Sequence, residues 1–109
     1  MKTITEETKE SVQIDLILRE VKNELYLAEK KFPQFPKDFV HQCAIMAEEA
    51  GEAVRAANQA QWDNGSLQDL RNEYLQTAAM CVRAINALGT LEYVLIHVDE
   101  KTLDRLKKD

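Results

Sequence analysis

The chain has 109 residues, of which 45% are hydrophobic and 30% are charged, and its formal net charge is −5. This length supports one domain with a modest core, and the composition is that of a folded chain rather than a disordered one. The acidic balance disfavours binding to a nucleic-acid polymer, which requires a basic surface. With only three glycines and two prolines, the composition favours long helices. We therefore expect a single all-α domain over residues 1–109.

The sequence shows no signal for a membrane or an export pathway. Residues 1–10 are polar and acidic and lack the apolar core of a signal peptide. No apolar stretch approaches the roughly 20 residues that span a bilayer. Cys43 and Cys81 belong to no metal-spacing motif, which predicts buried, reduced cysteines. We expect a soluble, cytoplasmic protein.

The first predicted helix runs from about Glu6 to Lys31. Thr3 and Glu6 have the spacing of a capping box at its start. Two prolines within residues 32–36 end the helix, because proline cannot continue it. Apolar residues recur at a heptad-like spacing, which predicts a stripe for bundle packing. This stripe consists of Ile14, Leu18, Val21, Leu25 and Ala28.

The second predicted helix begins after Asp38, a suitable N-cap, and continues to about Ala60. Gly51 lowers its helix propensity by roughly 1 kcal/mol relative to alanine and would allow a close approach. One face of this helix is apolar and comprises Phe39, Cys43, Ala47, Ala50, Val54 and Ala57. The other face combines Glu49 and Glu52 with His41, Ile45 and Ala56. Such a mixed face suits a cleft or a subunit contact better than open water.

The third predicted helix spans about Leu67 to Leu88. Residues 62–65 read as a turn, Ser66 is the N-cap, and Gly89 is the C-terminal stop. The predicted buried stripe comprises Leu70, Tyr74, Ala78, Cys81, Ile85 and Leu88. A different face groups Glu73, Gln76, Met80 and Arg83. Residues 90–107 predict a shorter or broken fourth helix.

These elements predict a small antiparallel helical bundle with short connections. Its core covers roughly residues 12–88, followed by the C-terminal helical segment 90–107. The second and third helices form a hairpin in this arrangement, which can bring Glu49 and Glu52 opposite Glu73 and Gln76.

The cluster of Glu48, Glu49 and Glu52 is the most informative feature of the chain. Carboxylates three residues apart share a helix face and repel each other. Next to apolar surface each carboxylate prefers to be protonated, and a divalent cation removes both costs. The alternative is an ordinary solvated face. Against it, the i+4 positions of Glu48 and Glu49 are Glu52 and Ala53, so neither glutamate has a basic helical partner.

The donor types select the metal. A di-iron bundle requires Glu-x-x-His pairs, and neither His41 nor His97 follows a glutamate at that spacing. Zinc would require a set of His and Cys ligands. Hard oxygen donors favour magnesium, manganese or calcium, and magnesium commonly binds phosphates. A nucleotide substrate is therefore the natural expectation.

The acidic residues resemble those of a known family. The run 48–52 (EEAGE), followed by Glu73 and Gln76 on the next helix, is similar to the EExxE and ExxD motifs of the all-α nucleotide pyrophosphohydrolases of the MazG type. Residues 31–35 also resemble the loop before the acidic helix in that family. The resemblance covers roughly residues 18–88.

The resemblance implies magnesium-dependent hydrolysis of a nucleoside triphosphate, often a deoxynucleotide, to the monophosphate and pyrophosphate, with manganese as a substitute ion. It implies that Glu49, Glu52 and Glu73 are metal ligands and that Glu48 orients the attacking water, with Glu48 and Glu52 as the catalytic pair. Gln76 stands where the family has aspartate. Its amide oxygen can coordinate magnesium but cannot act as a general base that accepts a proton. Gln76 can instead contact the base of the nucleotide or a phosphate-bound water.

Other substrate contacts are open to more than one interpretation. Arg83 is a candidate phosphate ligand, or else it pairs with Asp69 or Glu73. Asn86 is a candidate contact for the sugar or base. The aromatic candidates for a base-binding wall are Phe32, Phe35, Phe39 and Trp62, all of which are also candidates for core or interface positions.

Two long amphipathic helices with a second, partly apolar face predict a homodimer or homotetramer, as the resemblance also implies. A non-enzymatic alternative remains: a helical nucleotide-binding or interaction module that has weak turnover or none. The substitution at Gln76 favours that alternative.

Overall fold

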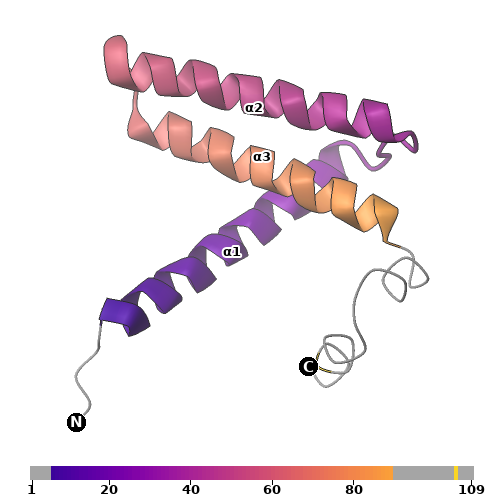
Figure 1. The fold of residues 1–109 in the computed structure, drawn as a ribbon, viewed down its shortest axis with the longest axis horizontal. Helices are drawn as coiled ribbons and strands as arrows, with labels where there is room; N and C mark the ends of the chain where they lie inside the picture. Colours follow the sequence, from indigo (N-terminus) through magenta and orange to yellow (C-terminus); the bar gives the residue numbers. More distant parts are fainter. Residues whose placement is uncertain (1–5, 90–104, 106–109) are drawn as a thin grey trace.

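A computed structural model of the chain describes residues 6–89 and 105 (Figure 1). This part contains three helices, α1 (Glu6–Lys31), α2 (Phe39–Trp62) and α3 (Leu67–Leu88), and no strand. The all-α prediction is confirmed for these residues. The predicted cap at Thr3 and the predicted helix over 90–107 lie outside the described residues. Among the helices that are described, none has the length and apolar character needed to cross a bilayer.

The helix boundaries follow from local sequence signals. The bounds of α1 and α3 agree with the prediction, whereas α2 continues to Trp62 instead of ending at Ala60. At the start of α2 the backbone N–H of His41 donates to the Asp38 carboxylate at 3.0 Å. At the start of α3 the N–H of Asp69 donates to the Ser66 hydroxyl at 3.0 Å. Both predicted N-caps are confirmed, because each satisfies a free N–H of the first helical turn.

The turn between α2 and α3 depends on two small residues. Asn64 adopts a positive φ of 59°, a left-handed conformation that asparagine tolerates better than most residues. The N–H of Gly65 donates to the carbonyl of Gln59 at 2.7 Å. A Cβ at Gly65 would lie 2.8 Å from Gln59. The chain therefore reverses tightly here and returns α3 alongside α2.

The helix α3 is the centre of the described fold. It packs against both α2 and α1. Figure 1 shows α2 and α3 as an antiparallel hairpin and α1 crossing α3 obliquely. The buried apolar residues are few and mostly small, namely Ala53, Ala56, Leu75 and Ala79. Within the described part of the chain, no large side chain is fully buried.

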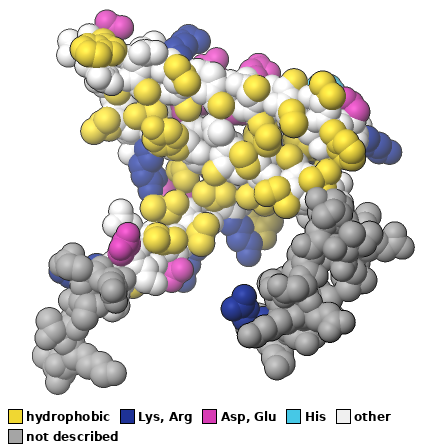
Figure 2. All heavy atoms as spheres, in the orientation of Figure 1, with side chains coloured by type: hydrophobic (Ala, Val, Ile, Leu, Met, Phe, Trp, Pro, Cys, Tyr) yellow, Lys and Arg dark blue, Asp and Glu magenta, His cyan; other side chains and the backbone are white. Residues whose placement is uncertain are grey.

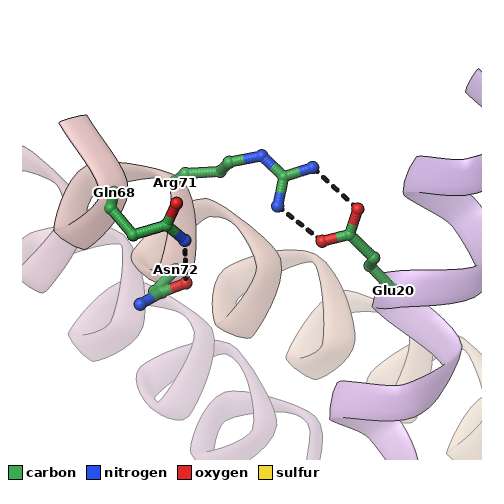
Figure 3. A network of polar contacts seen from close by, with 4 residues as sticks. All are labelled: Glu20, Gln68, Arg71 and Asn72. Carbon is green, nitrogen blue, oxygen red and sulfur yellow. Dashed lines mark hydrogen bonds and ion pairs between the residues drawn. The ribbon is translucent and has the colours of Figure 1, made fainter. Parts of the chain in front are cut away.

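An ion pair joins α1 to α3. The guanidinium of Arg71 donates to both oxygens of Glu20, at 2.8 Å and 2.5 Å (Figure 3). Hydrogen bonding to Arg71 lowers the pKa of Glu20, and the same bonds raise the pKa of Arg71. Next to this pair, the amide of Gln68 donates to the side-chain oxygen of Asn72 at 3.0 Å. This bidentate contact fixes the orientation of α1 on α3.

The segment that links α1 to α2 is held by two buried polar side chains. Gln42 is 4% exposed, and its amide donates to the carbonyl of Pro36 at 2.7 Å. Arg83 of α3 is 7% exposed, and its Nη2 donates to the carbonyl of Phe32 at 2.7 Å. The Arg83 guanidinium also lies 4.9 Å from the centre of the Phe35 ring. These contacts anchor the linker on α2 and α3.

The predicted buried faces are wrong for α2 and α3. On α2 the buried residues are Gln42, Ala53 and Ala56, whereas the predicted apolar face is largely exposed. On α3 the buried residues are Leu75, Ala79 and Arg83, whereas Tyr74 and Ile85 of the predicted stripe are 59% and 67% exposed. Both helices carry apolar or small residues on more than one side, and contacts between the helices decide which side is buried.

Two further expectations about burial are corrected. On α1 the first residues of the predicted stripe, Ile14 and Leu18, are 49% and 59% exposed. Val21 is half-buried, nearer to the crossing with α3. Both cysteines are free, as predicted, but Cys43 is exposed and Cys81 is only half-buried.

Candidate metal and nucleotide site

A cleft of about 570 Å³ lies between the second half of α1, the linker, α2 and α3. Its walls combine carboxylates, one buried arginine, and apolar and aromatic side chains. The lining residues are Glu24, Leu27, Ala28, Lys31, Phe32, Gln34, Phe35, Pro36, His41, Ile45, Glu48, Glu49, Gln76, Ala79, Met80 and Arg83. Its volume is in the range of small-molecule sites, which are concave, largely apolar and carry a few polar groups. We call this the nucleotide cleft, after the substrate that the sequence leads us to expect.

Glu49 is a half-buried carboxylate of the nucleotide cleft. Partial burial raises its pKa above the ordinary value of 4.5, and the negative charges of Glu73, Glu48 and Glu52 raise this pKa further. Desolvation and repulsion both disfavour the ionised carboxylate. A proton or a cation next to Glu49 would relieve both effects.

Glu73 faces α2 from α3 and has an unsatisfied oxygen. Its Oε2 atom is buried and has no hydrogen-bond partner among the described residues. The nearby hydroxyl of Thr77 donates to the backbone carbonyl of Glu73, at 2.8 Å, and so leaves the carboxylate without this donor. A buried acceptor without a partner costs roughly 1–3 kcal/mol, and more when it is charged. A bound cation would remove this cost.

A second, polar cleft of about 260 Å³ lies on the same pair of helices. It is lined by Glu52, Arg55, Ala56, Gln59, Asp69, Asn72, Glu73 and Gln76. The side chains of Arg55 and Glu52 approach to 3.5 Å, but both are largely exposed. Such exposed ion pairs contribute little to stability, so the pair with Arg55 leaves Glu52 available to another cation.

The structure distributes the predicted metal ligands over both clefts. Glu48 and Glu49 line the nucleotide cleft, Glu52 and Glu73 line the polar cleft, and Gln76 lines both. Across residues 6–89 and 105, no three His, Cys, Asp or Glu side chains are already arranged to hold a metal ion. The oxygen donors fit magnesium in kind, and the unsatisfied Oε2 of Glu73 is an acceptor that a cation would satisfy. A complete ligand set would require side chains to change rotamer.

Arg83 lies in the nucleotide cleft, as the phosphate-contact interpretation requires. Within the described residues, Arg83 forms no ion pair or hydrogen bond with Asp69 or Glu73. It contacts the Phe32 carbonyl and the Phe35 ring instead. Both partners are neutral, so the guanidinium is a buried positive charge without a carboxylate bound to it. A guanidinium has five N–H donors, and the contact with Phe32 uses one of its two terminal nitrogens.

The remaining candidates separate into two groups. Phe32 and Phe35 line the nucleotide cleft. Phe39 and Trp62 are 67% and 72% exposed and line neither cleft. Asn86 is exposed near the end of α3, and it too lies outside both clefts.

Sequence reasoning missed two acidic residues that line these clefts, Glu24 of the nucleotide cleft and Asp69 of the polar cleft. Asp69 lines the polar cleft together with Glu73, four residues later on α3. The i,i+4 spacing places the two carboxylates on one helix face and could have identified Asp69. Its position next to the Ser66 cap had assigned it to the helix start instead.

A comparison with known proteins finds no protein family, no curated protein and no solved structure that matches this chain. The geometry of the two clefts and the pattern of the sequence therefore carry the functional assignment.

Proposed function

We propose that the chain is a magnesium-dependent nucleoside triphosphate pyrophosphohydrolase, which releases a nucleoside monophosphate and pyrophosphate. One observation carries the proposal. The buried, unsatisfied Oε2 of Glu73 lies on the helix opposite Glu49, whose pKa is raised by burial and by the charge of Glu73. Two destabilised carboxylates at one helix contact, next to a cleft of substrate size, indicate a site that is completed by a cation.

The metal ligands in this proposal come from both helices. Glu49 and Glu52 of α2, with Glu73 and Gln76 of α3, would hold magnesium between the two clefts. When bound, magnesium would neutralise the phosphate charge that develops during cleavage of the anhydride bond. The uncharged Gln76 gives this set one negative charge fewer than a fourth carboxylate would, so the affinity for the ion is reduced.

The nucleotide cleft supplies the contacts for the rest of the substrate. Arg83 offers its unused N–H groups to a phosphate oxygen, and guanidinium groups suit this role because they bind phosphate in a bidentate manner. The exposed ring of Phe32 and the half-buried ring of Phe35 line the same cleft. They offer a face on which a base can stack. In this proposal the phosphate end of the substrate lies inside the cleft, because Arg83 is buried there.

The attacking water requires a base near the carboxylate cluster. Glu48 lines the nucleotide cleft and is exposed, so it can accept a proton from water and release it to solvent. Glu52 occupies the same helix face one turn later, and it would orient that water from the polar cleft. A carboxylate positioned in this way contributes roughly 10²–10⁴-fold to the rate.

The direct test is pyrophosphate release from a panel of nucleoside triphosphates with magnesium. We expect release by the wild-type chain and a loss of roughly 10²-fold or more in Glu52→Gln and Glu73→Gln. Glu29→Gln, which changes an exposed glutamate of α1 outside both clefts, is the matched control and should retain full activity. Equal activity in all three variants would contradict the proposal.

A binding module without turnover is the second candidate. Two observations favour it: the amide of Gln76, and the absence of a preformed metal-ligand group within the described residues. This candidate predicts nucleotide binding in the cleft with no pyrophosphate release from any triphosphate. The Gln76→Asp variant separates the two candidates, because an added carboxylate should strengthen metal binding and raise turnover in an enzyme but should create none in a module.

A further inference from the structure

The linker between α1 and α2 carries one side chain that is able to donate and accept hydrogen bonds. Residues 32–36 read FPQFP, so Gln34 is the polar side chain among them. It is exposed and lines the nucleotide cleft. Within the described part of the chain, no hydrogen bond involves the Gln34 carboxamide. Its oxygen and its NH2 group are therefore both available to a ligand.

The backbone on both sides of Gln34 is held by buried side chains. The guanidinium of Arg83 donates to the Phe32 carbonyl at 2.7 Å, and the amide of Gln42 donates to the Pro36 carbonyl at 2.7 Å. Prolines at two of the five linker positions restrict the backbone further. Gln34 lies between the two anchored carbonyls, so its place in the cleft is set before a ligand arrives. A group positioned in this way loses less conformational entropy on binding.

Aromatic residues lie on both sides of Gln34 along the chain. Phe32 and Phe35 line the same cleft as Gln34. Exposed apolar groups are common on this chain, since Figure 2 shows hydrophobic side chains gathered over both α2 and α3, so a ring alone does not identify a base site. A free carboxamide with two rings in one cleft is more specific. It matches both parts of a nucleobase, which has a flat face and a polar edge.

The order of groups along the cleft separates the neutral linker from the proposed metal ligands. Arg83 is next to the linker, because it contacts the backbone of Phe32. Gln76, which lines both clefts, lies about two turns before Arg83 on α3, or about 10 Å along the helix. The cleft thus runs from an uncharged aromatic wall, past a guanidinium, to the proposed metal ligands. This is the order of base, phosphate and metal in a nucleotide bound with its base at the linker.

We propose that Gln34 is the specificity-determining residue that reads the base of the nucleotide. Its amide oxygen accepts from an N–H group of the base, and its NH2 group donates to an adjacent acceptor on the same edge. A glutamine side chain pairs with the edge of adenine in this bidentate manner. A base analogue without such a donor–acceptor pair loses this contact. The inference rests on the proposed function for the class of ligand, and it adds the group that selects the base.

The test measures the binding of nucleoside monophosphates to the full chain by equilibrium dialysis. Monophosphates are suitable because a pyrophosphohydrolase cannot cleave them, so base reading is measured apart from turnover. The probes are AMP, GMP, CMP, UMP and purine riboside monophosphate, which has no exocyclic group on its base. Gln34→Met removes the carboxamide and keeps the length of the side chain. Gln13→Met makes the same change at an exposed position of α1 outside both clefts and is the matched control.

The expected result is a difference in affinity that depends on Gln34. The wild-type chain should bind at least one of the four common monophosphates roughly tenfold more tightly than purine riboside monophosphate, since two hydrogen bonds are lost with the analogue. In Gln34→Met this difference should fall below about twofold. The Gln13→Met control should keep the wild-type difference.

Equal binding of all five probes by the wild type, or a difference that persists in Gln34→Met, would overturn the inference. Pyrophosphate release from triphosphates, measured separately, distinguishes this failure from that of the proposed function. Release without a difference that depends on Gln34 would overturn the inference alone. A difference that depends on Gln34 in a chain that releases no pyrophosphate would support the inference and contradict the proposed function. A chain that binds none of the probes at millimolar concentration would overturn the base-reading role of Gln34.

Discussion

Burial, and then the charge of Glu73 across the contact between α2 and α3, raise the pKa of Glu49, while the Oε2 of Glu73 is buried without a hydrogen-bond partner among the described residues. The ionised form of Glu49 is therefore disfavoured, and the described side chains offer no hydrogen bond to the Glu73 oxygen. Such an arrangement lowers the stability of the fold at neutral pH. Its presence at the edge of a substrate-sized cleft is what one expects of a site shaped for a ligand rather than for stability.

Replacing Glu49 by glutamine should stabilise the chain at neutral pH when no divalent cation is present. The pKa of Glu49 is raised in the folded state, so its ionisation costs stability as the pH rises through that pKa. The gain from Glu49→Gln should be below about 1 kcal/mol because solvent screens the partly exposed carboxylate, and it should vanish below pH 4.5. Thermal unfolding as a function of pH measures this, with Glu29→Gln on an exposed part of α1 as control. A loss of stability at neutral pH would contradict the burial and repulsion described here.

The Glu20–Arg71 pair should affect the stability of the fold in the opposite sense to Glu49 as the pH changes. The pKa of Glu20 is lowered in the folded state by hydrogen bonding to Arg71. Its contribution is therefore present above the unfolded pKa and is lost as the pH falls through the folded pKa. We expect Glu20→Gln to lower the melting temperature at neutral pH and to have no effect in strong acid. Glu29→Gln, on an exposed part of α1, should leave the melting temperature unchanged at both pH values. A double-mutant cycle with Arg71→Gln should show coupling, and strict additivity would argue against the ion pair.

Two glycines should respond to alanine in opposite directions. At Gly51 an added Cβ meets no atom within 4 Å, so Gly51→Ala should raise the free energy of unfolding by roughly 0.5–1 kcal/mol through helix propensity. At Gly65 the added Cβ would lie 2.8 Å from Gln59, and Gly65→Ala should destabilise the chain by roughly 1–3 kcal/mol. Urea unfolding of both variants checks the contrast. Equal effects at the two positions would show that the turn after α2 is looser than the structure has it.

Removal of the buried guanidinium should loosen the linker between α1 and α2. Arg83→Leu leaves the carbonyl of Phe32 without its donor and removes the contact with the Phe35 ring, so we expect a loss of roughly 1.5–3 kcal/mol. Arg55→Leu changes an arginine whose side chain is 68% exposed and should cost less than about 0.5 kcal/mol. Urea unfolding measures both. Amide hydrogen exchange should also increase in residues 32–36 of the Arg83 variant, and unchanged protection there would contradict the anchoring role.

Much of the fold could be predicted because its signals are local. The bounds of α1 and α3 and the caps at Asp38 and Ser66 depend on neighbouring residues only. The break between α1 and α2 follows in the same way from the prolines of the linker. Each of these predictions needed only proline, cap chemistry and helical spacing.

The buried faces could not be predicted, since α2 carries small and apolar residues almost all round. Ala53 and Ala56 are buried while Ala47 and Ala50 are exposed, and nothing in the sequence distinguishes one alanine pair from the other. Burial of Arg83 was missed for a similar reason: a long-range contact with the Phe32 carbonyl, from a residue far away in sequence, makes it favourable. In the site, the helix spacing predicted which residues lie near each other, but the division of the carboxylates between two clefts depends on the packing of α2 on α3.

Calorimetric titration of magnesium into the nucleotide-free chain tests the central claim most directly, because it asks whether the carboxylates of α2 and α3 share a cation. The account predicts saturable binding to the wild type, tighter as the pH rises and Glu49 loses its proton. It also predicts loss of that binding in Glu73→Gln with no change in Glu29→Gln. Absence of saturable binding to the wild type, or equal binding to the wild type and Glu73→Gln, would contradict it.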